Sequence, residues 1–284
     1  MEPRTAVKSG VDPSAGGLSA AEFRFRAMTY NIHGCVNQDR QTQPLRTAAV
    51  ISGFNANLIA LQEVDSETAQ AKREDQAKIL AEALGMNFVC FPVEKNGLHN
   101  FGLAILSHYP LQDVSCDWLP SLYPLLKPRK RGVICATMLS PAGPIRVFNT
   151  HLSLFKLERR MQIDALLSRE WLNSVPEDDP VIFCGDLNAG STSAVYRKLV
   201  RHLVDVQESS NGAALPKPTF HSRSPLFRID HMFISNHFHI YGVAVPRTPQ
   251  VQAASDHLPL IADLALTDRP ATEHTLKALG ATLS

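Results

Sequence analysis

Six short polar clusters carry most of the side chains in this chain that could do chemistry. They are Met28–His33, Leu61–Glu63, Asn149–His151, Gly185–Asn188, Arg228–His231 and Ser255–His257, each following or interrupting an apolar run. Such runs are typical of buried strands, so the clusters should lie where those strands reach solvent. Carboxylates, amides and imidazoles that converge at strand ends suit a divalent-cation site built from oxygen ligands. Such a site suits phosphoester hydrolysis.

Glu63 directly follows the apolar run Leu58–Gln62, which places a carboxylate at the end of a strand whose other residues are buried. Mg²⁺ prefers hard oxygen ligands and keeps several of its waters, so one or two protein carboxylates can hold it. A surface glutamate that closes a strand would show the same pattern, and both interpretations stay open for this residue alone.

Asp186 and Asn188 follow Gly185, a residue that permits a tight backbone. The Asp-x-Asn spacing points two oxygen-bearing side chains the same way. Asp186 could then orient and deprotonate a water molecule, while Asn188 could hold a metal or phosphate oxygen without adding negative charge. The alternative is a plain turn, because glycine, aspartate and asparagine are all favoured in turns for local reasons.

Two histidines at strand ends, His151 and His257, form the third element. An imidazole can bind a phosphate oxygen, stabilise a pentavalent transition state or protonate a leaving oxygen, although a strand-end histidine can also be purely structural. Asp256 precedes His257, and Asp230 precedes His231. Because adjacent strand residues face opposite ways, we expect Asp230, rather than Asp256, to orient His257. A neighbouring carboxylate would fix the imidazole tautomer and raise its pKa.

Composition restricts the classes of protein to consider. The 284 residues are 44% hydrophobic and 19% charged, which favours one large folded domain and excludes global disorder. A net charge of +1 provides no overall field for a polyanion, so nucleic acid would need a local basic patch. The five cysteines have no paired spacing, which indicates reduced, mostly buried thiols rather than a zinc site. With no secretory signal in the first 22 residues, we expect a cytoplasmic protein.

The order of expected elements indicates one α/β domain with much antiparallel sheet. Residues 1–22 are predicted as a flexible leader, residues 23–268 as the domain and residues 269–284 as a tail. Helices are expected at Leu45–Gly53, Glu74–Leu84, Leu157–Leu172 and Ser193–Leu203. Strands are expected at Phe23–Tyr30, Leu58–Gln62, Phe88–Pro92, Gly102–Ser107, Val133–Leu139, Ile145–Thr150, Val181–Cys184, Ile229–Ser235, Ile240–Val245 and Leu258–Leu266.

Seven motifs extend this pattern along the chain: TYNIHG, LQEVD, GLAILS, FNTHL, GDLNA, RIDHMFIS and SDHLPL. With these motifs in this order, the region from Phe23 to Leu266 resembles the endonuclease/exonuclease/phosphatase superfamily, which includes DNase I-like nucleases, apurinic endonucleases, inositol polyphosphate phosphatases and neutral sphingomyelinases. The resemblance implies an α/β four-layer sandwich of two mixed, mostly antiparallel β-sheets packed face to face with helices on the outside. It also implies phosphoester hydrolysis with Mg²⁺, or Mn²⁺, as cofactor.

The resemblance further implies roles for individual positions. Asp186 matches the carboxylate that activates water. His151 matches a position used for phosphate contact or acid chemistry, and Asp230 and His257 match a pair that stabilises the scissile phosphate. Asn188 matches an amide that contacts phosphate or metal. The implied metal-site residues are Glu63 as a direct ligand, Asn31 and Asp256.

Two further positions are candidates for substrate binding. His33 stands two residues after Asn31, where several relatives carry aspartate or asparagine, so this chain departs from the pattern there. It could bind phosphate, tune the metal preference or simply pack. Arg131 ends the basic run Lys127–Arg131 and falls where some relatives place a phosphate-contacting arginine, although such a run can also be a solvated strand edge.

The motifs leave the substrate open, because loops rather than the metal site choose it. An apolar segment, Asp117–Leu126, precedes the basic run and would suit an anionic membrane surface and a lipid headgroup or small phosphoester, unless it packs on the domain. A DNA or RNA endonuclease is the alternative, with Arg129, Lys130, Arg131, Arg159 and Arg160 lining a groove. A catalytically silent binding module is disfavoured by the complete polar set, and no obligate protein partner is evident.

Overall fold

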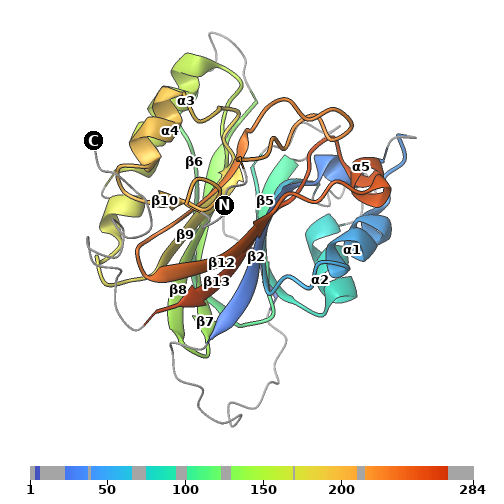
Figure 1. Ribbon diagram of the computed structural model, residues 1–284, viewed down its shortest axis with the longest axis horizontal. Coiled ribbons are helices and arrows are strands. Elements are labelled where there is room, and N and C mark those ends of the chain that lie inside the picture. The colour runs from blue at the N-terminus through green and yellow to red at the C-terminus, as the bar shows by residue number, and fades with distance from the viewer. Residues whose placement is uncertain are drawn as a thin grey trace.

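A computed structural model describes residues 4–6, 23–37, 40–65, 75–93, 101–122, 129–168, 170–209 and 215–267. Within them the chain forms two β-sheets (Figure 1). The seven-stranded sheet has the order β1 (Arg4–Ala6), β4 (Asn87–Pro92), β5 (Phe101–Ser107), β3 (Leu58–Asp65), β2 (Arg24–Asn31), β13 (Leu260–Leu266) and β12 (Phe238–Ala244). The six-stranded sheet has the order β10 (Val204–Asp205), β11 (Asp230–Ile234), β9 (Val181–Asp186), β8 (Gly143–His151), β7 (Gly132–Ser140) and β6 (Leu111–Trp118).

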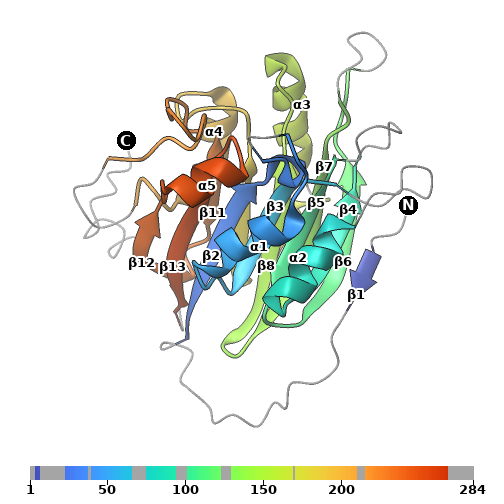
Figure 2. The ribbon, with the colours of Figure 1, turned by 90° about the vertical axis from the view of Figure 1, so that its right-hand side faces the viewer.

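The sheets pack face to face, and helices cover their outer faces. Helices α1 (Pro44–Ser52), α2 (Gln76–Leu84) and α5 (Pro249–Ala254) lie on the side of the seven-stranded sheet, in front in Figure 2. Helices α3 (Lys156–Leu166) and α4 (Ala194–Leu199) lie on the side of the six-stranded sheet. Only β2–β3 and β8–β9 are parallel among the strand pairs of the described residues. The structure therefore confirms the predicted four-layer sandwich of mixed, mostly antiparallel sheets.

Three clusters of buried hydrophobic side chains separate these four layers. The central cluster joins the inward faces of the two sheets and contains Ile105 of β5 and Val147 of β8. A second cluster, with Leu80 of α2, lies between the seven-stranded sheet and its helices. A third, with Ile163 of α3 and Leu199 of α4, lies between the six-stranded sheet and its helices. Burial of this apolar surface is the dominant force that holds the layers together.

Most predicted elements are present, but their limits differ. Helix α3 ends at Leu166 instead of Leu172, because the chain turns there and continues in a short 3₁₀ segment, Leu172–Ser174. Strand β6 was not predicted, because most of its residues are exposed at a sheet edge and its alternation is confined to Val114–Trp118. Part of the predicted leader, Arg4–Ala6, pairs with β4 through backbone bonds, which need no particular side chains. The rest of that leader and the predicted tail lie outside the described residues.

The central layer also contains a buried polar bridge between the two sheets. The Gln62 amide on β3 donates to Asn149 Oδ1 on β8 at 2.7 Å. Asn149 Nδ2 in turn donates to the carbonyl oxygens of Leu61 and Ala104, at 2.8 and 2.9 Å. Buried polar groups destabilise a fold unless they are paired, so this bridge favours a single alignment of the two sheets.

Chain direction brings the polar clusters to one edge of the sandwich. The parallel strands β2 and β3, and the parallel strands β8 and β9, all reach this edge at their carboxyl ends. Strand β11 begins there, because it runs antiparallel to β9 with Asp230 opposite Asp186. Strand β13, antiparallel to β2, begins there shortly after His257. In the described part of the chain, no helix is long and apolar enough to cross a membrane.

We expect the Asn149→Ala variant to lose about 3 kcal/mol of unfolding free energy, because an unsatisfied buried polar group costs about 1–3 kcal/mol and several partners are affected. The change removes three side-chain hydrogen bonds and leaves the Gln62 amide without this acceptor. Urea denaturation followed by circular dichroism measures the loss. The exposed Asn173→Ala variant is the matched control and should stay within about 0.5 kcal/mol of the parent. Equal losses in the two variants would contradict a specific role for the bridge.

Candidate active site

Asp186 occupies the centre of the polar edge. It ends β9 and pairs in register with His151 of β8 on one side and with Asp230 of β11 on the other. Gly185, directly before it, has φ 148°, and a Cβ there would lie 1.9 Å from the carbonyl oxygen of Thr150. Glycine is therefore required at this position for β8 and β9 to pair closely enough to bring His151 and Asp186 together.

Glu63 reaches the same site through a β-bulge. The prediction placed Glu63 after its strand, but β3 continues to Asp65 and Glu63 is the extra residue between Gln62 and Val64. Its φ of 54° is in the left-handed region, which re-aims the side chain. The Asn31 amide then donates to Glu63 Oε1 at 3.2 Å and to Asp186 Oδ2 at 3.0 Å, linking carboxylates from the two sheets.

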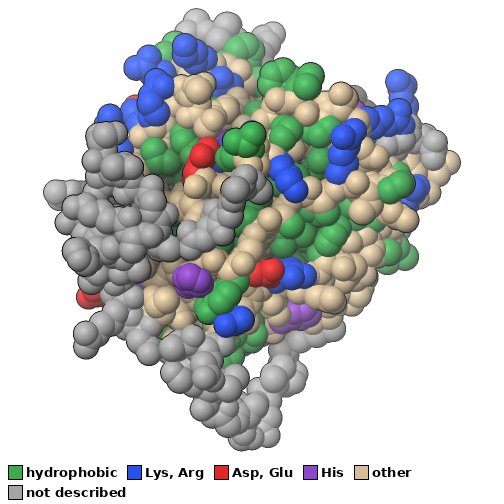
Figure 3. Space-filling model, in the orientation of Figure 1, with side chains coloured by type: hydrophobic (Ala, Val, Ile, Leu, Met, Phe, Trp, Pro, Cys, Tyr) green, Lys and Arg blue, Asp and Glu red, His purple; other side chains and the backbone are tan. Residues whose placement is uncertain are grey.

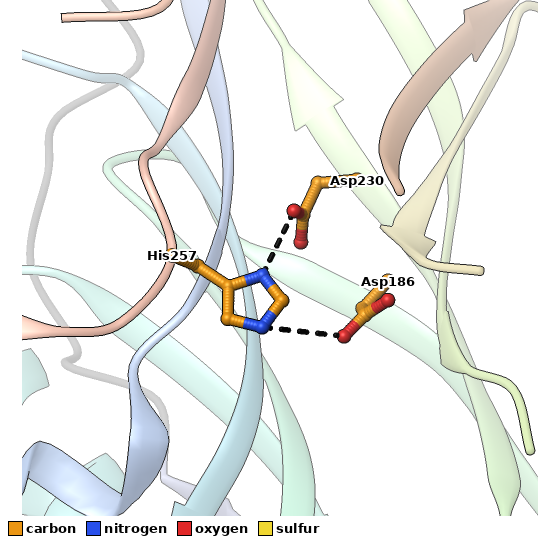
Figure 4. A group of neighbouring side chains, drawn as sticks. All are labelled: Asp186, Asp230 and His257. Carbon is orange, nitrogen blue, oxygen red and sulfur yellow. Dashed lines mark hydrogen bonds and ion pairs between the residues drawn. The ribbon is translucent and has the colours of Figure 1, made fainter. Parts of the chain in front are cut away.

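His257 lies between two carboxylates (Figure 4). Its Nδ1 is 2.9 Å from Asp230 Oδ2 and its Nε2 is 3.7 Å from Asp186 Oδ2. The pairing with Asp230 agrees with the expectation from strand alternation, whereas Asp256 contacts a different residue. Thr219 Oγ1 also donates to Asp230 Oδ2, at 2.5 Å. The other oxygen, Asp230 Oδ1, is buried and has no hydrogen-bond partner among the described residues.

The charges around His257 set its protonation. Burial alone would lower the pKa of this imidazole, but Asp230, Asp186 and Asp256 outweigh burial and raise it to about 10. The metal-free imidazole is therefore charged at neutral pH, with both ring nitrogens acting as donors. His257 can neutralise negative charge that develops beside Asp186.

The pKa of Asp186 is also raised, but for a carboxyl group this favours the neutral form. Burial and the nearby charge of Asp230 raise the pKa of the Asp186 carboxyl to about 7, despite the opposing effects of His257 and of hydrogen bonds from Asn188 and Asn31. A carboxyl group with such a pKa can exchange a proton near neutral pH, which is the property a general base needs.

His151 lies on the other side of Asp186 and is held neutral. Its Nε2 is 3.4 Å from Asp186 Oδ2 and 3.0 Å from the Asn188 amide nitrogen. Burial lowers the pKa of His151 well below its ordinary value, and the positive charges of Arg131, His257 and Arg129 lower it further. The two imidazoles that flank Asp186 therefore carry different charges. Arg131 itself is half-buried just before β7, close enough for its charge to reach His151.

Asn188 braces the loop after β9. Its φ of 48° is in the left-handed region, which asparagine adopts more readily than most residues. The Asn188 backbone N–H donates to Asp186 Oδ1 at 2.8 Å, and the side-chain amide donates to the carbonyl oxygen of Leu152 at 3.0 Å. The backbone N–H of Asn188 thus orients Asp186, and its side-chain amide holds the chain just after β8.

His33 and Asp256 form a separate pair at the mouth of the site. His33 Nδ1 is 2.8 Å from Asp256 Oδ1, and the His33 backbone N–H donates to Asn31 Oδ1 at 3.1 Å. The contact with Asp256 raises the pKa of the half-exposed His33 imidazole. Burial would raise the pKa of Asp256, but His33 and His257 outweigh burial and lower it.

Sequence reasoning assigned no role to three residues that support this site. Thr219 bonds Asp230, and the Phe220 ring lies 4.8 Å from the His257 ring. Ser255 donates to the carbonyl oxygen of Asn31 at 2.7 Å and accepts from the His257 backbone N–H at 3.1 Å. Ser255 was included in the cluster Ser255–His257 and in the SDHLPL motif, although its hydrogen bonds could not be foreseen from them. Thr219 and Phe220 lie in an irregular segment that carries no comparable signal.

Two other sequence features lie away from the site or pack on the domain. His231 is fully buried on the opposite face of β11, with Nε2 2.8 Å from the carbonyl oxygen of Ala189. Trp118 belongs to β6, where its indole N–H donates to the carbonyl oxygen of Val93 at 2.8 Å and its ring contacts Phe91. Leu119 is buried, so this part of the predicted apolar loop is a packing element. Residues 123–126 of that loop, and residues 127–128 of the basic run, lie outside the described residues.

One group of side chains in the described part of the chain has the spacing of a metal centre. Asp186, Asp230 and His257 each offer a ligand atom, and these atoms lie within 4.8 Å of one another. The charged His257 is a poor ligand because its nitrogens carry protons. Glu63 and Asp186, on either side of the Asn31 amide nitrogen, offer a second set of hard oxygens.

A four-layer sandwich whose two sheets contribute carboxylates and imidazoles to one shared edge is the arrangement of the DNase I-like phosphoesterases. The chain belongs to the endonuclease/exonuclease/phosphatase family, whose model matches residues 28–257. The uncharacterized protein YbhP of Escherichia coli K12 is 28% identical over 267 residues, a match that spans 86% of this chain and 98% of YbhP.

Solved structures have the same fold. An endonuclease/exonuclease/phosphatase from Beutenbergia cavernae superimposes with a TM-score of 0.70 and 24% identity, covering 86% of this chain and 72% of that chain. A mannosyl-6-phosphatase from Bacteroides thetaiotaomicron superimposes with a TM-score of 0.70 and 20% identity, covering 84% of this chain and 99% of that chain. At these identities the likeness establishes the architecture alone.

We expect the His257 imidazole of the metal-free protein to titrate with a pKa of about 10. The Asp230→Asn variant should bring this pKa down toward the ordinary histidine value, because the nearest negative charge is lost. NMR titration of the ring carbons measures both. The Asp263→Asn variant, whose carboxylate pairs with Arg26 at 2.7 Å, is the control and should leave His257 unchanged.

The same shift makes stability depend on pH. The folded pKa of about 10 lies above the ordinary value of about 6.5, so the His257–Asp230 pair contributes fully below pH of about 6.5. Its contribution is lost as pH rises through about 10. The Asp230→Asn variant should therefore lose less stability than the parent across this range. A parallel decline in both proteins, or a parent His257 that titrates at the ordinary value, would contradict the assignment.

Proposed function

We propose that the protein is a divalent-metal-dependent phosphoester hydrolase in which Asp186 activates the attacking water. The observation that carries the proposal is the setting of Asp186, a buried carboxylate 3.4 Å from the neutral His151 and 3.7 Å from the charged His257. Family membership supports the reaction class, and the raised pKa of Asp186 supports its role as a base.

The residues present fit a hard divalent cation. Glu63 and Asp186 offer carboxylate oxygens close together, and Asp230 Oδ1 is a buried oxygen without a hydrogen-bond partner in the described part of the protein. Such oxygens suit Mg²⁺ or Mn²⁺. We assign Glu63, Asn31 and Asp256 to the metal region, with Glu63 as a direct ligand. The bound cation would supply charge neutralisation at the phosphate oxygens.

The remaining chemistry belongs to the side chains. Asp186, held by the Asn188 N–H and the Asn31 amide, accepts a proton from water and aims the water at phosphorus. His257, kept protonated by Asp230, donates a hydrogen bond to a phosphate oxygen as negative charge develops there. His151, neutral and fixed beside Asn188, contacts the phosphate from the opposite side.

Further side chains would position the substrate. We assign Asn188, Arg131 and His33 to substrate binding, because each lies beside a residue of the site. The positive charge of Arg131 reaches His151, and His33 is half-exposed beside Asp256. A small phosphoester or a lipid headgroup is the favoured substrate, since a net charge of +1 provides no general attraction for a long polyanion.

We also propose that residues 23–268 form the catalytic domain and that the protein works in the cytoplasm. All elements of the described chain except β1 lie within these limits. The five cysteines are free thiols, four buried and Cys116 half-buried, as expected of a reducing compartment.

Replacing Asp186 with asparagine should lower kcat for metal-dependent hydrolysis by about 10²–10⁴-fold, because the proton acceptor is lost while the side-chain volume is kept. Release of p-nitrophenol from bis-p-nitrophenyl phosphate and phosphate release from monoesters, with Mg²⁺ or Mn²⁺, measure the effect. The Asp164→Asn variant is the control, since that exposed carboxylate contacts Lys198 on the outer helices. A parent as inactive as Asp186→Asn on every ester would reject the proposal.

Replacing Glu63 with glutamine should weaken Mn²⁺ and Mg²⁺ binding by roughly tenfold or more, because one ligand charge is removed. Isothermal titration calorimetry measures this without any substrate. Glu208→Gln is a suitable control, because that glutamate contacts Arg228 at 2.6 Å away from the site. Unchanged cation affinity in Glu63→Gln would remove Glu63 from the ligand set, whatever the activity.

A DNA or RNA endonuclease is the second candidate function. It is favoured by Arg129 and Lys130, which are exposed just before β7, next to Arg131. Plasmid nicking by the parent that is absent from Asp186→Asn would support it. No nicking with Mg²⁺ or Mn²⁺, together with hydrolysis of small esters, would reject it.

A further inference from the structure

We propose that two exposed apolar segments beside the site form a docking surface for a lipid bilayer that contains anionic lipids. This apolar rim consists of Leu154, Phe155, Leu157 and Met161 at the start of α3, and of Leu226 and Phe227 before β11. The proposal goes beyond hydrolysis, because it concerns how the protein meets a surface and does not require the phosphoester to be a lipid.

The rim is unusually apolar for exposed surface. Leu154, Leu157 and Leu226 are 71%, 60% and 76% exposed, and Phe227 is 60% exposed. Of the eleven exposed large hydrophobic side chains in the described residues, six belong to these two short segments. Isolated exposed leucines need no explanation, but such a concentration marks a surface that another apolar body covers.

Both segments are attached to the site by hydrogen bonds and ring contacts. The β8–α3 segment begins directly after His151, and its Leu152 carbonyl oxygen accepts from the Asn188 amide at 3.0 Å. The other segment is folded back so that the Phe227 N–H donates to the Phe220 carbonyl oxygen at 2.8 Å. The Phe220 ring in turn lies tilted against the His257 ring, with centroids 4.8 Å apart. One segment is thus attached beside His151 and the other beside His257, and Asp186 contacts both histidines.

The charge on these segments identifies the kind of surface. Lys156, Arg159 and Arg160 accompany the first segment, and Arg223 accompanies the second. The one acidic residue within Leu152–Met161 or Phe220–Arg228 is Glu158, whose side chain is buried and accepts from the Leu122 N–H at 2.7 Å. Figure 3 shows Lys and Arg side chains interspersed with hydrophobic ones at the upper end of the molecule, where α3 lies in Figure 1. Leucines flanked by cations complement a bilayer with anionic headgroups.

The types of apolar residue favour a bilayer over single-stranded nucleic acid. Four of the six rim residues, Leu154, Leu157, Met161 and Leu226, are aliphatic and cannot stack on bases. Aliphatic side chains instead gain free energy by entering the boundary between headgroups and acyl chains. The bilayer thus accounts for the aliphatic residues and the cations together, whereas nucleic acid accounts for the cations alone.

The test is vesicle co-sedimentation of the full-length protein and two double variants. Leu154→Gln with Leu157→Gln removes apolar side chains, and Lys156→Gln with Arg160→Gln removes charge. The matched control is Val200→Gln with Arg201→Gln, an exposed apolar residue and an exposed cation after α4. Vesicles are phosphatidylcholine alone or phosphatidylcholine with about one third phosphatidylserine.

We expect the parent and the control to bind the anionic vesicles and to bind neutral vesicles weakly. Each rim variant should lose roughly tenfold or more in apparent affinity for the anionic vesicles, because two inserted or attracted side chains are missing. Equal binding to neutral and anionic vesicles, no binding to either, or a rim variant that binds as well as the control would overturn the proposal.

Two further measurements separate the alternatives. Fluorescence anisotropy with single-stranded DNA should show no rim-dependent binding, and DNA binding that the rim variants lose, without vesicle binding, would assign the rim to nucleic acid instead. Hydrolysis of the soluble ester bis-p-nitrophenyl phosphate should stay within about twofold of the parent in both rim variants. Failure of hydrolysis in all proteins would reject the proposed function alone, whereas failure of vesicle binding with intact hydrolysis would reject the docking surface alone.

Discussion

The face-to-face alignment of the two sheets is the constraint on which the rest of the structure depends. Gln62 and Asn149 bridge the sheets inside an otherwise apolar layer, at 2.7 Å. Asn31 bridges them again at the polar edge, through Asp186 at 3.0 Å. Hydrophobic burial alone would tolerate small slides of one sheet over the other, because it is non-directional. Hydrogen bonds between buried groups are directional, so a slide would leave those groups unpaired at a cost of kilocalories per mole.

The site follows from this alignment, because neither sheet contains it alone. Glu63 and Asn31 come from the seven-stranded sheet, and Asp186 and His151 from the six-stranded sheet. At the shared edge, burial acts on every ionisable group, yet the outcomes differ. Burial and Asp230 raise the pKa of Asp186, carboxylates raise that of His257 against burial, and burial with nearby cations lowers that of His151. Within a few ångströms of one another, Asp186 can therefore act as a base, His257 is a cation and His151 is neutral.

Chemistry and substrate choice are carried by different parts of the molecule. The side chains to which we assign the chemistry stand at or beside strand ends, which the packed sheets hold rigidly. The surface that surrounds them comes from the β8–α3 segment and the segment before β11, which can vary without disturbing the sheets. This separation explains how one family includes enzymes for unlike phosphoesters, and why the apolar and basic side chains of those segments say more about partners than the site does.

The sequence by itself determined the order of most elements and the polar clusters, since apolar runs are local signals, and it implied the sandwich through the resemblance of its motifs to a known family. It even indicated that Asp230 would face His257, because alternation along a strand is local geometry. Only the tertiary structure decided that Glu63 enters the site through a bulge, that Thr219 and Phe220 support Asp230 and His257, and that the partly exposed Trp118 bonds Val93. Those outcomes depend on contacts between residues far apart in the chain, and such contacts leave no pattern in a short stretch of sequence.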